Sequence, residues 1–567
     1  MTTADYIVDF LVDRGVSDVF GIPGGVVLGL LYAFDRKSGS VSVHLSYHEQ
    51  AAAFAASGYA QTSGKLGVAY ATRGPGITNM QTAIADAFYD SIPILILTGH
   101  SAARKYPSMR VEQDQDMDPI PTLSGITKYA ARVERAQDVP RELERAYTLA
   151  MEGRKGPVVL DFASRILAEN VEPPQEEPRG SGTAGPEERE YEAAVRNITA
   201  ALRQAKRPVF LIGNGINQSK TAAQMRRLAE KASVPVLSSV ISQDVMPDSP
   251  LYFGYIGSHG TRYGNFILSK ADLIISLGNR MDFPVSSKSF APVMERAKVL
   301  RVDVDRAEFL RKVPNSEEFY AELSALLPRL LEAELRYDGS GEWVAVCRRL
   351  RKALVECDVS DVVRTAAKVL QTFDPQSVLV SDVGNNPFWL ARAYAYAGLT
   401  NPLLFSKSFS ALGCALGKAI GAYYATGRPV VCSVGDQGLQ LNIQELQFIV
   451  QHKLPITILL WNNVSSGMIR HWQKLRYGGH YLHTTLDTGY SCPDFAAIVG
   501  AYGLPCRRVR AADGAGLEDC RSAAQPCLIE LEIAEDAEMD PNLPMGAPCQ
   551  DLAPALPRAL YEELDRL

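Results

Sequence analysis

Pro429-Val-Val-Cys-Ser-Val-Gly-Asp-Gln-Gly438 is an apolar run that leads directly into an acidic turn. A second apolar run over 456–461 ends in Asn462-Asn463, and apolar residues recur at helical spacing between the two runs. Two buried strands joined by a helix are typical of a parallel sheet, and the carboxyl ends of parallel strands share the edge where ligands bind. We therefore expect Asp436 and Asn463 to converge on one ligand site.

The chemistry of this pair favours a magnesium and phosphate site. A carboxylate and an amide oxygen are hard ligands that suit Mg²⁺, which usually also takes phosphate oxygens and water. Gly435 and Gly438 allow the backbone to approach a diphosphate near a helix N-terminus. Asp-x-Gly and Asn-Asn also occur in ordinary turns, so the specific signal is their combination across one strand–helix–strand unit.

Similar alternation of strand-like and helix-like runs extends outward over the whole 567-residue chain. It predicts an α/β protein with three doubly wound parallel-sheet domains. Expected helices lie at 4–14, 49–61, 76–88 and within 320–370, and the expected strands lie at 41–45, 67–72, 93–98, 208–212, 273–277, 298–304, 378–381, 429–434 and 456–461. The predicted domains are 1–170, 191–335 and 371–535, with a linker at 171–190 rich in Pro, Gly and Glu, a helical connection at 336–370 and a closing segment at 536–567.

Bulk composition excludes several classes of protein. A net charge of −6 without a basic cluster argues against nucleic-acid binding. The nine cysteines show no CxxC pair or Cys/His cluster, which argues against a zinc site or a disulfide framework. The sequence holds no run of about 18 apolar residues and no secretory signal pattern, so we expect a cytoplasmic protein that does not enter membranes.

The Asp436–Asn463 pattern resembles the signature of thiamine-diphosphate enzymes, Gly-Asp-Gly followed by Asn-Asn. The resemblance implies that the Asp436 and Asn463 side chains and the Ser465 carbonyl bind Mg²⁺. One position departs from the signature, since Gln437 replaces the usual glycine and Gly438 is displaced by one. Gln437 retains a backbone N–H for a phosphate, but its side chain needs room.

Three segments near the N-terminus resemble the pyrimidine-binding domain of acetolactate synthase-type enzymes: Gly21-Ile-Pro-Gly-Gly25, Ser46-Tyr-His-Glu49 and Gly74-Pro-Gly-Ile-Thr-Asn79. The resemblance implies that Glu49 bonds the aminopyrimidine ring of the cofactor and promotes its activation. Alone, Glu49 would be a first-turn glutamate favoured by the helix dipole. The other cofactor contacts implied in this domain are Gly24, Gly25, Pro75 and Asn79.

Two further segments are similar to parts of the same family's active site. Ser408-Phe-Ser-Ala-Leu-Gly413 includes Leu412, which is either the apolar support of the bent cofactor or an ordinary core leucine. In Ser466-Gly-Met-Ile-Arg-His-Trp-Gln-Lys-Leu475, the resemblance implies that Met468 contacts cofactor and that Trp472 lines the pocket for a second keto acid. Near the end of the chain, residues 542–548 resemble the family's closing segment.

The middle domain resembles the FAD-binding domain of acetolactate synthases over 257–265, 278–282 and 302–308. Arg280 matches an arginine between the flavin and the substrate carboxylate. The alternative is a domain that keeps this shape without a flavin. The residues implied in FAD binding are Gly213, Gly215, His259, Gly260, Thr261, Arg280 and Asp303.

Two departures from the family bear on the acceptor substrate. Gln115 matches a family glutamine, but Asp114 stands where the family has a phenylalanine that packs near the acceptor. Arg73 stands in place of a serine before Gly-Pro-Gly. A charged acceptor wall leads us to expect an acceptor larger or more polar than pyruvate, such as a nucleotide-linked keto sugar.

The resemblance implies a thiamine-diphosphate and Mg²⁺-dependent carboligase that decarboxylates pyruvate and passes the two-carbon unit to a second carbonyl. A simple 2-keto-acid decarboxylase would share the motifs, but its protonating histidines are not matched by any His-His pair in the chain. A dinucleotide-binding dehydrogenase or a non-catalytic relative would explain the glycine-rich turns but not Asp436, Asn463 and Glu49 together. The family pattern also implies a homodimer or homotetramer with shared active sites, and a regulatory subunit as a further candidate partner.

Overall fold

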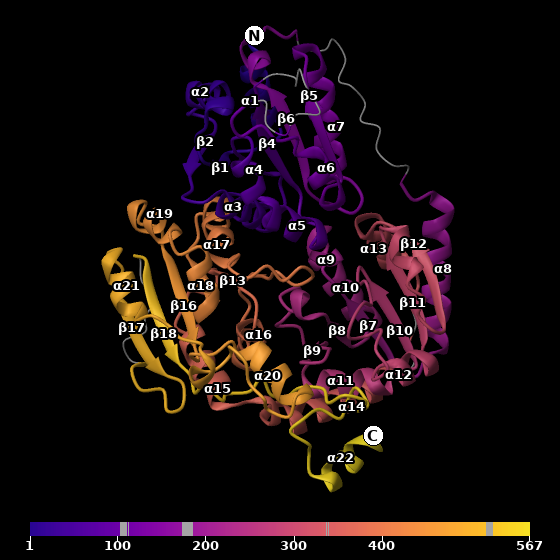
Figure 1. Cartoon of the computed structure of the whole chain (residues 1–567). Helices are drawn as coiled ribbons and strands as arrows, with labels where there is room; N and C mark the ends of the chain where they lie inside the picture. Colours follow the sequence, from indigo (N-terminus) through magenta and orange to yellow (C-terminus); the bar gives the residue numbers. More distant parts are fainter. Residues whose placement is uncertain (102–109, 111–112, 173–184, 336, 338, 518–524) are drawn as a thin grey trace.

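A computed structural model of the chain describes residues 1–101, 110, 113–172, 185–335, 337, 339–517 and 525–567. These residues form three domains, each built on a parallel six-stranded sheet with helices on both faces (Figure 1). The predicted fold class is therefore confirmed. Most of the predicted 171–190 linker lies outside the described residues.

The first sheet has the strand order β2-β1-β3-β4-β6-β5. Its strands are β1 (Asp18–Gly21), β2 (Ser42–Leu45), β3 (Gly67–Tyr70), β4 (Ile94–His100), β5 (Tyr129–Val133) and β6 (Val158–Ala163). Its helices are α1 (Thr3–Asp13), α2 (Leu28–Arg36), α3 (Glu49–Ser63), α4 (Pro75–Asn79), α5 (Gln81–Tyr89), α6 (Ile120–Leu123) and α7 (Val139–Met151). The single helix predicted over 76–88 is thus two helices, which meet at Met80.

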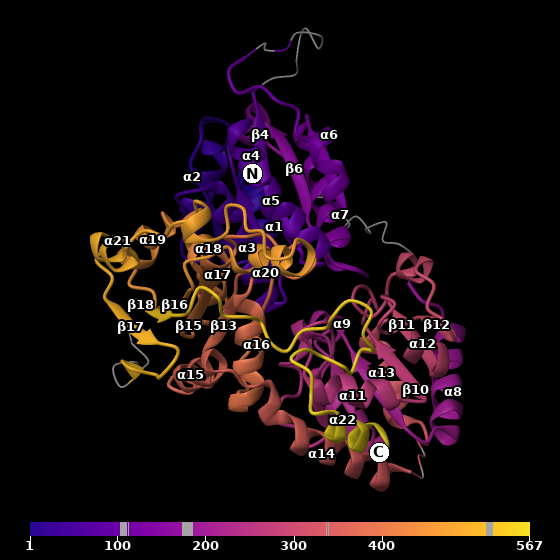
Figure 2. The same ribbon diagram turned by 60° about the horizontal axis from the view of Figure 1, so that its bottom comes forward.

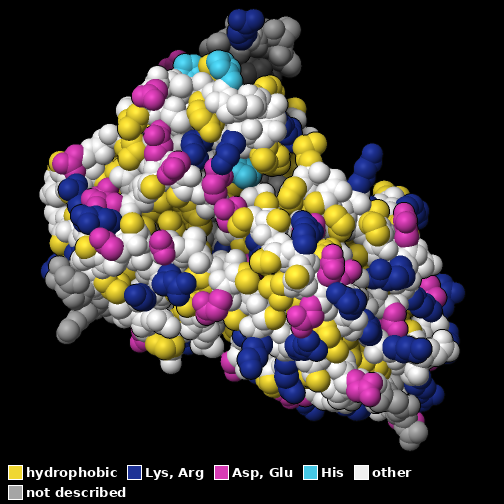
Figure 3. Space-filling model, turned by 90° about the horizontal axis from the view of Figure 1, so that it is seen from below, with side chains coloured by type: hydrophobic (Ala, Val, Ile, Leu, Met, Phe, Trp, Pro, Cys, Tyr) yellow, Lys and Arg dark blue, Asp and Glu magenta, His cyan; other side chains and the backbone are white. Residues whose placement is uncertain are grey.

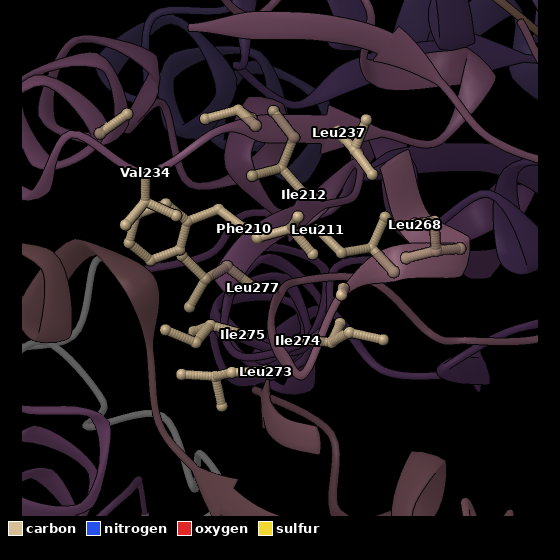
Figure 4. Packing of buried hydrophobic residues seen from close by; sticks show 14 of the residues in the cluster. Phe210, Leu211, Ile212, Val234, Leu237, Leu268, Leu273, Ile274, Ile275 and Leu277 are labelled. Atoms are coloured by element: carbon tan, nitrogen blue, oxygen red, sulfur yellow. The ribbon is translucent and has the colours of Figure 1, made fainter. Parts of the chain in front are cut away.

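The middle sheet has the order β12-β11-β10-β7-β8-β9. Its strands are β7 (Pro208–Ile212), β8 (Val236–Ser238), β9 (Tyr252–Tyr255), β10 (Leu273–Leu277), β11 (Lys298–Asp303) and β12 (Ser316–Tyr320). Its helices are α8 (Glu188–Gln204), α9 (Gly215–Gln218), α10 (Ala222–Ala232), α11 (Arg262–Lys270), α12 (Ala291–Arg296) and α13 (Leu323–Glu332). Continuous apolar strands bury side chains on both faces of this sheet, as Figure 4 shows for β7 and β10.

The third sheet has the order β14-β13-β15-β16-β18-β17. Its strands are β13 (Val378–Ser381), β14 (Leu403–Leu404), β15 (Val430–Gly435), β16 (Ile456–Asn462), β17 (Cys506–Arg510) and β18 (Cys527–Glu532). Its helices are α15 (Asp361–Leu370), α16 (Asn386–Ala397), α17 (Ala415–Thr426), α18 (Asp436–Leu441), α19 (Glu445–Gln451), α20 (Gly467–Arg476) and α21 (Phe495–Ala501). Helix α14 (Ser340–Leu354) connects it to the middle domain.

Helices α3 and α17 join the first and third domains at close range. A Cβ atom added to Gly421 would lie 1.8 Å from the Ala55 carbonyl oxygen, and one added to Gly58 would lie 2.1 Å from that of Lys418. Only glycine allows two helix backbones to approach this closely. The interface therefore depends on these two glycines.

The C-terminal segment returns from the third domain across the middle domain and ends in α22 (Arg558–Asp565) (Figure 2). Leu543 N–H donates to the Ser258 carbonyl (2.8 Å), and Arg262 binds the carbonyls of Leu552 (2.9 Å) and Pro554 (2.6 Å). These bonds fix the segment on the middle domain.

The face in Figure 3 carries basic and acidic side chains interspersed with one another, as expected from the small net charge. None of the helices in the described ranges combines the length and apolarity needed to cross a bilayer.

Candidate active site

Asp436 lies where the sequence analysis expected, directly after β15 and at the start of α18. Its carboxylate is buried and accepts the N–H groups of Gln437 (2.7 Å) and Ser465 (3.2 Å) and the hydroxyl of Tyr490 (3.0 Å). Burial raises the pKa of Asp436, and these donors oppose the rise. A cation bound here would favour the ionised carboxylate further.

Asn463 and Ser465 come close to Asp436 because β16 pairs with β15, with Gly435 opposite Trp461. The loop then turns at Val464, whose φ of 47° is unusual for a β-branched residue. This turn brings the Ser465 N–H to the Asp436 carboxylate. The three predicted metal ligands are thereby placed together.

The structure also separates the roles of the two neighbouring asparagines. Asn462 Nδ2 donates to Glu530 Oε1 at 2.7 Å, so this side chain is engaged within the sheet. Asn463 is buried, and its Nδ2 has no hydrogen-bond partner among the described residues. A buried amide NH₂ group without a partner is costly and can donate only to an acceptor such as a phosphate oxygen, whereas Oδ1 is the Asn463 atom that could bind a metal. The donor set of carboxylate, amide and carbonyl oxygens fits Mg²⁺.

Glu49 opens α3 at the carboxyl edge of the first sheet. Its Oε2 accepts a hydrogen bond from Asn79 Nδ2 at 2.9 Å, and a Cβ on Gly76 would lie 3.6 Å from Oε1. Gly24 packs on the neighbouring Thr72, where an added Cβ would come within 2.4 Å of the Thr72 Cβ. Pro75 begins α4 beside these residues, and space is open at Gly25. The three segments predicted to bind the pyrimidine ring thus share one edge.

A cavity of about 1130 Å³ lies between the three domains. This volume is above the usual range for small-molecule sites, roughly 300–1,000 Å³. Predicted residues that line it are Gly213, Gly215, His259, Gly260, Arg280, Asp303, Met468 and Trp472. Thr261 is not part of the lining, because its buried hydroxyl caps α11 by accepting from Gly264 N–H (3.2 Å).

Arg280 connects all three domains at the wall of this cavity. It pairs with Asp282 (2.8 Å) in its own domain, donates to Ser408 Oγ (2.8 Å) in the third domain and reaches the Tyr89 carbonyl (3.3 Å) in the first. Asp303, the last residue of β11, also lines this cavity. Burial raises the pKa of Asp303 to about 6.

Models of thiamine pyrophosphate enzymes match all three domains of the chain. The N-terminal TPP binding domain matches residues 1–121, the central domain 195–330 and the C-terminal TPP binding domain 382–531. The chain belongs to the thiamine pyrophosphate enzymes. The predicted family is therefore confirmed, and with it the use of thiamine diphosphate.

Within this family the chain is similar to acetolactate synthase large subunits. It is 32% identical to isozyme 2 of Escherichia coli, over 96% of this chain and 98% of the relative. It is also 32% identical to the enzyme of Lactococcus lactis, over 95% and 94%, and 28% identical to a probable large subunit of Methanocaldococcus jannaschii, over 100% and 98%. The predicted enzyme class, a thiamine-dependent carboligase of this type, is confirmed.

The structure explains the displaced glycine of this thiamine pyrophosphate enzyme. The Gln437 side chain is exposed and so has room, whereas a Cβ on Gly438 would lie 3.0 Å from Asp382 Oδ1. Asp382 is fully buried and accepts the N–H groups of Gly413 and Ala415, both at 3.0 Å. It thereby holds the turn beside Leu412, which is half-buried and not an ordinary core leucine.

Sequence reasoning missed Asp382 and a second buried carboxylate, Glu445. Glu445 Oε1 accepts the N–H groups of Tyr47 (2.9 Å) and His48 (3.0 Å), immediately before Glu49. Burial raises the pKa of Glu445 to about 7. Its position in the first turn of α19 gave no signal in the sequence, whereas Asp382 could have been noticed because it directly follows the strand 378–381.

Arg73 and Asp114, the residues predicted to form a charged acceptor wall, belong to the first domain and do not line the large cavity. The carbonyl oxygen of Gln115 would lie 2.6 Å from a Cβ on Gly74, and Arg73 donates to Gln113 Oε1 at 3.3 Å. Asp114 is exposed beside them. Residues 102–109 and 111–112 of the same loop are outside the described ranges.

Proposed function

We propose that the chain decarboxylates pyruvate on thiamine diphosphate and transfers the two-carbon unit to a second carbonyl compound. The observation that carries this proposal is the convergence of Asp436, Asn463 and Ser465 at the ends of β15 and β16. The acetolactate synthase relatives support it over a simple decarboxylase or a dehydrogenase.

In this proposal the Asp436 and Asn463 side chains and the Ser465 carbonyl hold Mg²⁺. The glycines at 435 and 438 allow the diphosphate to approach the backbone, and the Gln437 N–H beside them orients the Asp436 carboxylate (2.7 Å). When bound, thiamine diphosphate supplies the nucleophilic carbon and the electron sink for decarboxylation.

In this proposal Glu49 is protonated and would donate a hydrogen bond to the pyrimidine ring of the cofactor. Asn79 orients its carboxyl group through the 2.9 Å hydrogen bond, and Glu445 fixes the turn before it. Leu412 supports the bent cofactor from the third domain. Gly24, Gly25 and Pro75 leave room for the ring.

We further propose that the active enzyme is at least a homodimer. Neither Glu49 nor Asp436 lines the large cavity of one chain, which supports sites assembled from two chains. Large apolar side chains are exposed beside both residues, including Leu45 (44%) before Glu49 and Leu441 (49%) after Asp436. A second copy would cover them. The words "large subunit" in the relatives' names support a second, regulatory subunit, and the sequence analysis adds a homotetramer and a cytoplasmic location as further expectations.

FAD is the cofactor that we propose for the large cavity. Gly213 and Gly215 approach Gly278 so closely that a Cβ on either would lie within 3.0 Å of the Gly278 backbone, which leaves a flat turn for a nucleotide. His259, Gly260, Arg280 and Asp303 line the space around it. The absorption spectrum of the purified protein tests this, because bound flavin absorbs visible light.

The direct test of the function is to incubate the purified protein with thiamine diphosphate, Mg²⁺ and pyruvate. Carbon dioxide release and acetolactate, identified by mass spectrometry, are the expected products. A nucleotide-linked keto sugar added with pyruvate tests the alternative of a larger acceptor. Absence of carbon dioxide release under all of these conditions would contradict the proposal.

A further inference from the structure

Lys407 lies on the loop between β14 and α17, where the first and third domains meet. The Lys407 and Ser408 N–H groups both donate to the Asp90 carboxylate at 2.9 Å, and this fixes the loop. The side chain is solvent-accessible within the large cavity, and its ammonium lies 4.8 Å from the ring centre of Phe388. Surrounding protein atoms nevertheless lower the pKa of Lys407 by desolvation.

The Lys407 ammonium has no hydrogen-bonding or ion-pair partner within the described part of the chain. Among the other basic residues that line the cavity, Arg154 pairs with Asp305 at 2.9 Å and Lys220 donates to the Ser63 carbonyl at 2.9 Å, whereas Lys288 is exposed and Arg476 lies over the Trp472 ring. Arg280 pairs with Asp282, as described above.

The carboxylates nearest to Lys407 are already in use. Asp282 and Asp90 both favour its charged form. However, Arg280 binds Asp282 at 2.8 Å, and Asp90 accepts the two loop N–H groups. The Lys407 ammonium is therefore a cation at the cavity wall whose nearest carboxylates are also bound by other groups.

The side chains around Lys407 include aromatic rings as well as the two carboxylates. The rings of Phe388 and His259 lie 4.3 Å apart, and those of His259 and His471 lie 6.4 Å apart. Burial, helped by Arg392, Lys407 and His471, lowers the pKa of His259 to about 3. His259 is thus neutral at physiological pH, chiefly because it is buried. The positive charges of Arg392 and Lys407 near it favour an anionic ligand at this corner.

This corner is continuous with Trp472, which the family resemblance implies in the pocket for the second keto acid. His471 is adjacent to Trp472, their ring centres lie 6.1 Å apart, and both line the cavity together with Met468. These residues belong to α20, which follows directly on the proposed metal loop. The proposed nucleotide site in the middle domain includes Gly213, Gly215 and Asp303. Lys407 instead belongs to the third domain, which would hold the diphosphate of thiamine diphosphate.

We propose that Lys407 determines acceptor specificity by pairing with an anionic group on the acceptor. The acceptor is then a ketone that carries a carboxylate or phosphate remote from its reacting carbonyl. This inference rests on the proposed function. The diphosphate of a bound dinucleotide is the other anionic group that could pair with Lys407. The experiment below distinguishes this diphosphate from an anionic acceptor.

Matched acceptors that differ in a single charged group test the inference, with pyruvate as donor. The pairs are 2-ketoglutarate with 2-ketobutyrate, and dihydroxyacetone phosphate with dihydroxyacetone. We expect the wild-type protein to prefer the member with the additional charged group in at least one pair. Lys407→Gln should raise KM for that member by about 10- to 100-fold, since a charge-assisted hydrogen bond is lost, and leave KM for the member without that group nearly unchanged. Lys407→Arg should retain most of the preference.

Lys312→Met is the matched control, because it removes a positive charge from a side chain that is 81% exposed in the middle domain. Inorganic phosphate provides a second measurement, since it should inhibit the wild-type reaction more strongly than that of Lys407→Gln. Flavin content is measured for every variant from its absorption spectrum.

Three outcomes would overturn the inference: no wild-type preference for a charged acceptor, equal losses on both members of a pair, or loss of flavin with acceptor preference intact. The last would assign Lys407 to the dinucleotide. A wild-type protein that releases no carbon dioxide from pyruvate would instead refute the proposed function itself. The two failures are therefore distinguishable.

Discussion

Asp86 on α5 and Lys418 on α17 form an ion pair at the contact between the first and third domains. Lys418 Nζ lies 2.7 Å from Asp86 Oδ2, and both side chains are fully buried. Ser406 Oγ donates to the other carboxylate oxygen. Burial opposes the charge on Lys418, but Asp86 outweighs it and raises the pKa of Lys418 above its usual value. The pair is thus an ionised contact without access to water.

Lys418→Met removes the cation and leaves the carboxylate buried with Ser406 as its remaining donor. We expect a loss of about 3–5 kcal/mol in unfolding free energy, because an uncompensated charge remains in the interior. Asp86→Asn/Lys418→Met has no buried charge and should recover most of the loss. Arg349→Met is the control: the Arg349–Glu563 pair is shorter, at 2.6 Å, but more than half exposed, so its removal should cost less than about 1 kcal/mol.

These differences are measured by urea unfolding followed by fluorescence and by thermal unfolding in a calorimeter. Because the chain has three domains and can unfold in several steps, the stabilities are compared for the first unfolding transition. The expected order of stability is wild type, Arg349→Met, the double variant and then Lys418→Met. A double variant no more stable than Lys418→Met would refute this reasoning, because the lost stability would then not come from the unpaired charge. So would a Lys418→Met protein within about 1 kcal/mol of the wild type.

Three further predictions concern the proposed site. Glu49→Gln should lower kcat by about 10²- to 10⁴-fold in the pyruvate assay while calorimetry still detects thiamine diphosphate binding, and unchanged turnover would exclude the role of its proton. Asn463→Ala should weaken Mg²⁺ binding by at least about tenfold, measured by titrating the quenching of protein fluorescence in the presence of cofactor. Asn462→Ala should change the Mg²⁺ affinity by no more than about a few-fold. Equal effects of the two substitutions would contradict the assignment of Asn463 as the ligand. Burial raises the pKa of Glu445 from 4.5 to about 7. The unfolding free energy of the wild type relative to Glu445→Gln should therefore be highest below pH 4.5 and fall by up to about 3 kcal/mol as the pH rises to 7. If urea unfolding shows the same difference between the two proteins at every pH in this window, the pKa of Glu445 is not raised.

Strands that are apolar throughout were predictable to the residue. The predicted runs 208–212 and 273–277 match β7 and β10 because buried parallel strands read as continuous apolar runs that end at polar or glycine residues. Helix ends were less predictable. Helix α8 begins at Glu188, inside the expected linker, because Glu187 and Glu190 form a capping box that composition alone does not reveal.

Side chains at strand ends could be placed from the sequence because a parallel sheet fixes where they meet. Asp436 and Asn463 converge for this reason, and Glu49 and Asn79 follow the same logic. The choice between neighbouring asparagines could not be made in this way, since it depends on Glu530 in a strand far along the chain.

The buried carboxylate Glu445 illustrates why the remaining site residues escaped prediction. Its helix belongs to the third domain, but its acceptor oxygen bonds the turn before Glu49 in the first. No local pattern at 445 distinguishes it from a helical surface glutamate, because the partners that bury it are almost four hundred residues away in sequence. The turn that precedes the proposed catalytic carboxylate in one domain is therefore fixed by a carboxylate of another. For that reason, substitutions at this domain interface should change activity as well as stability.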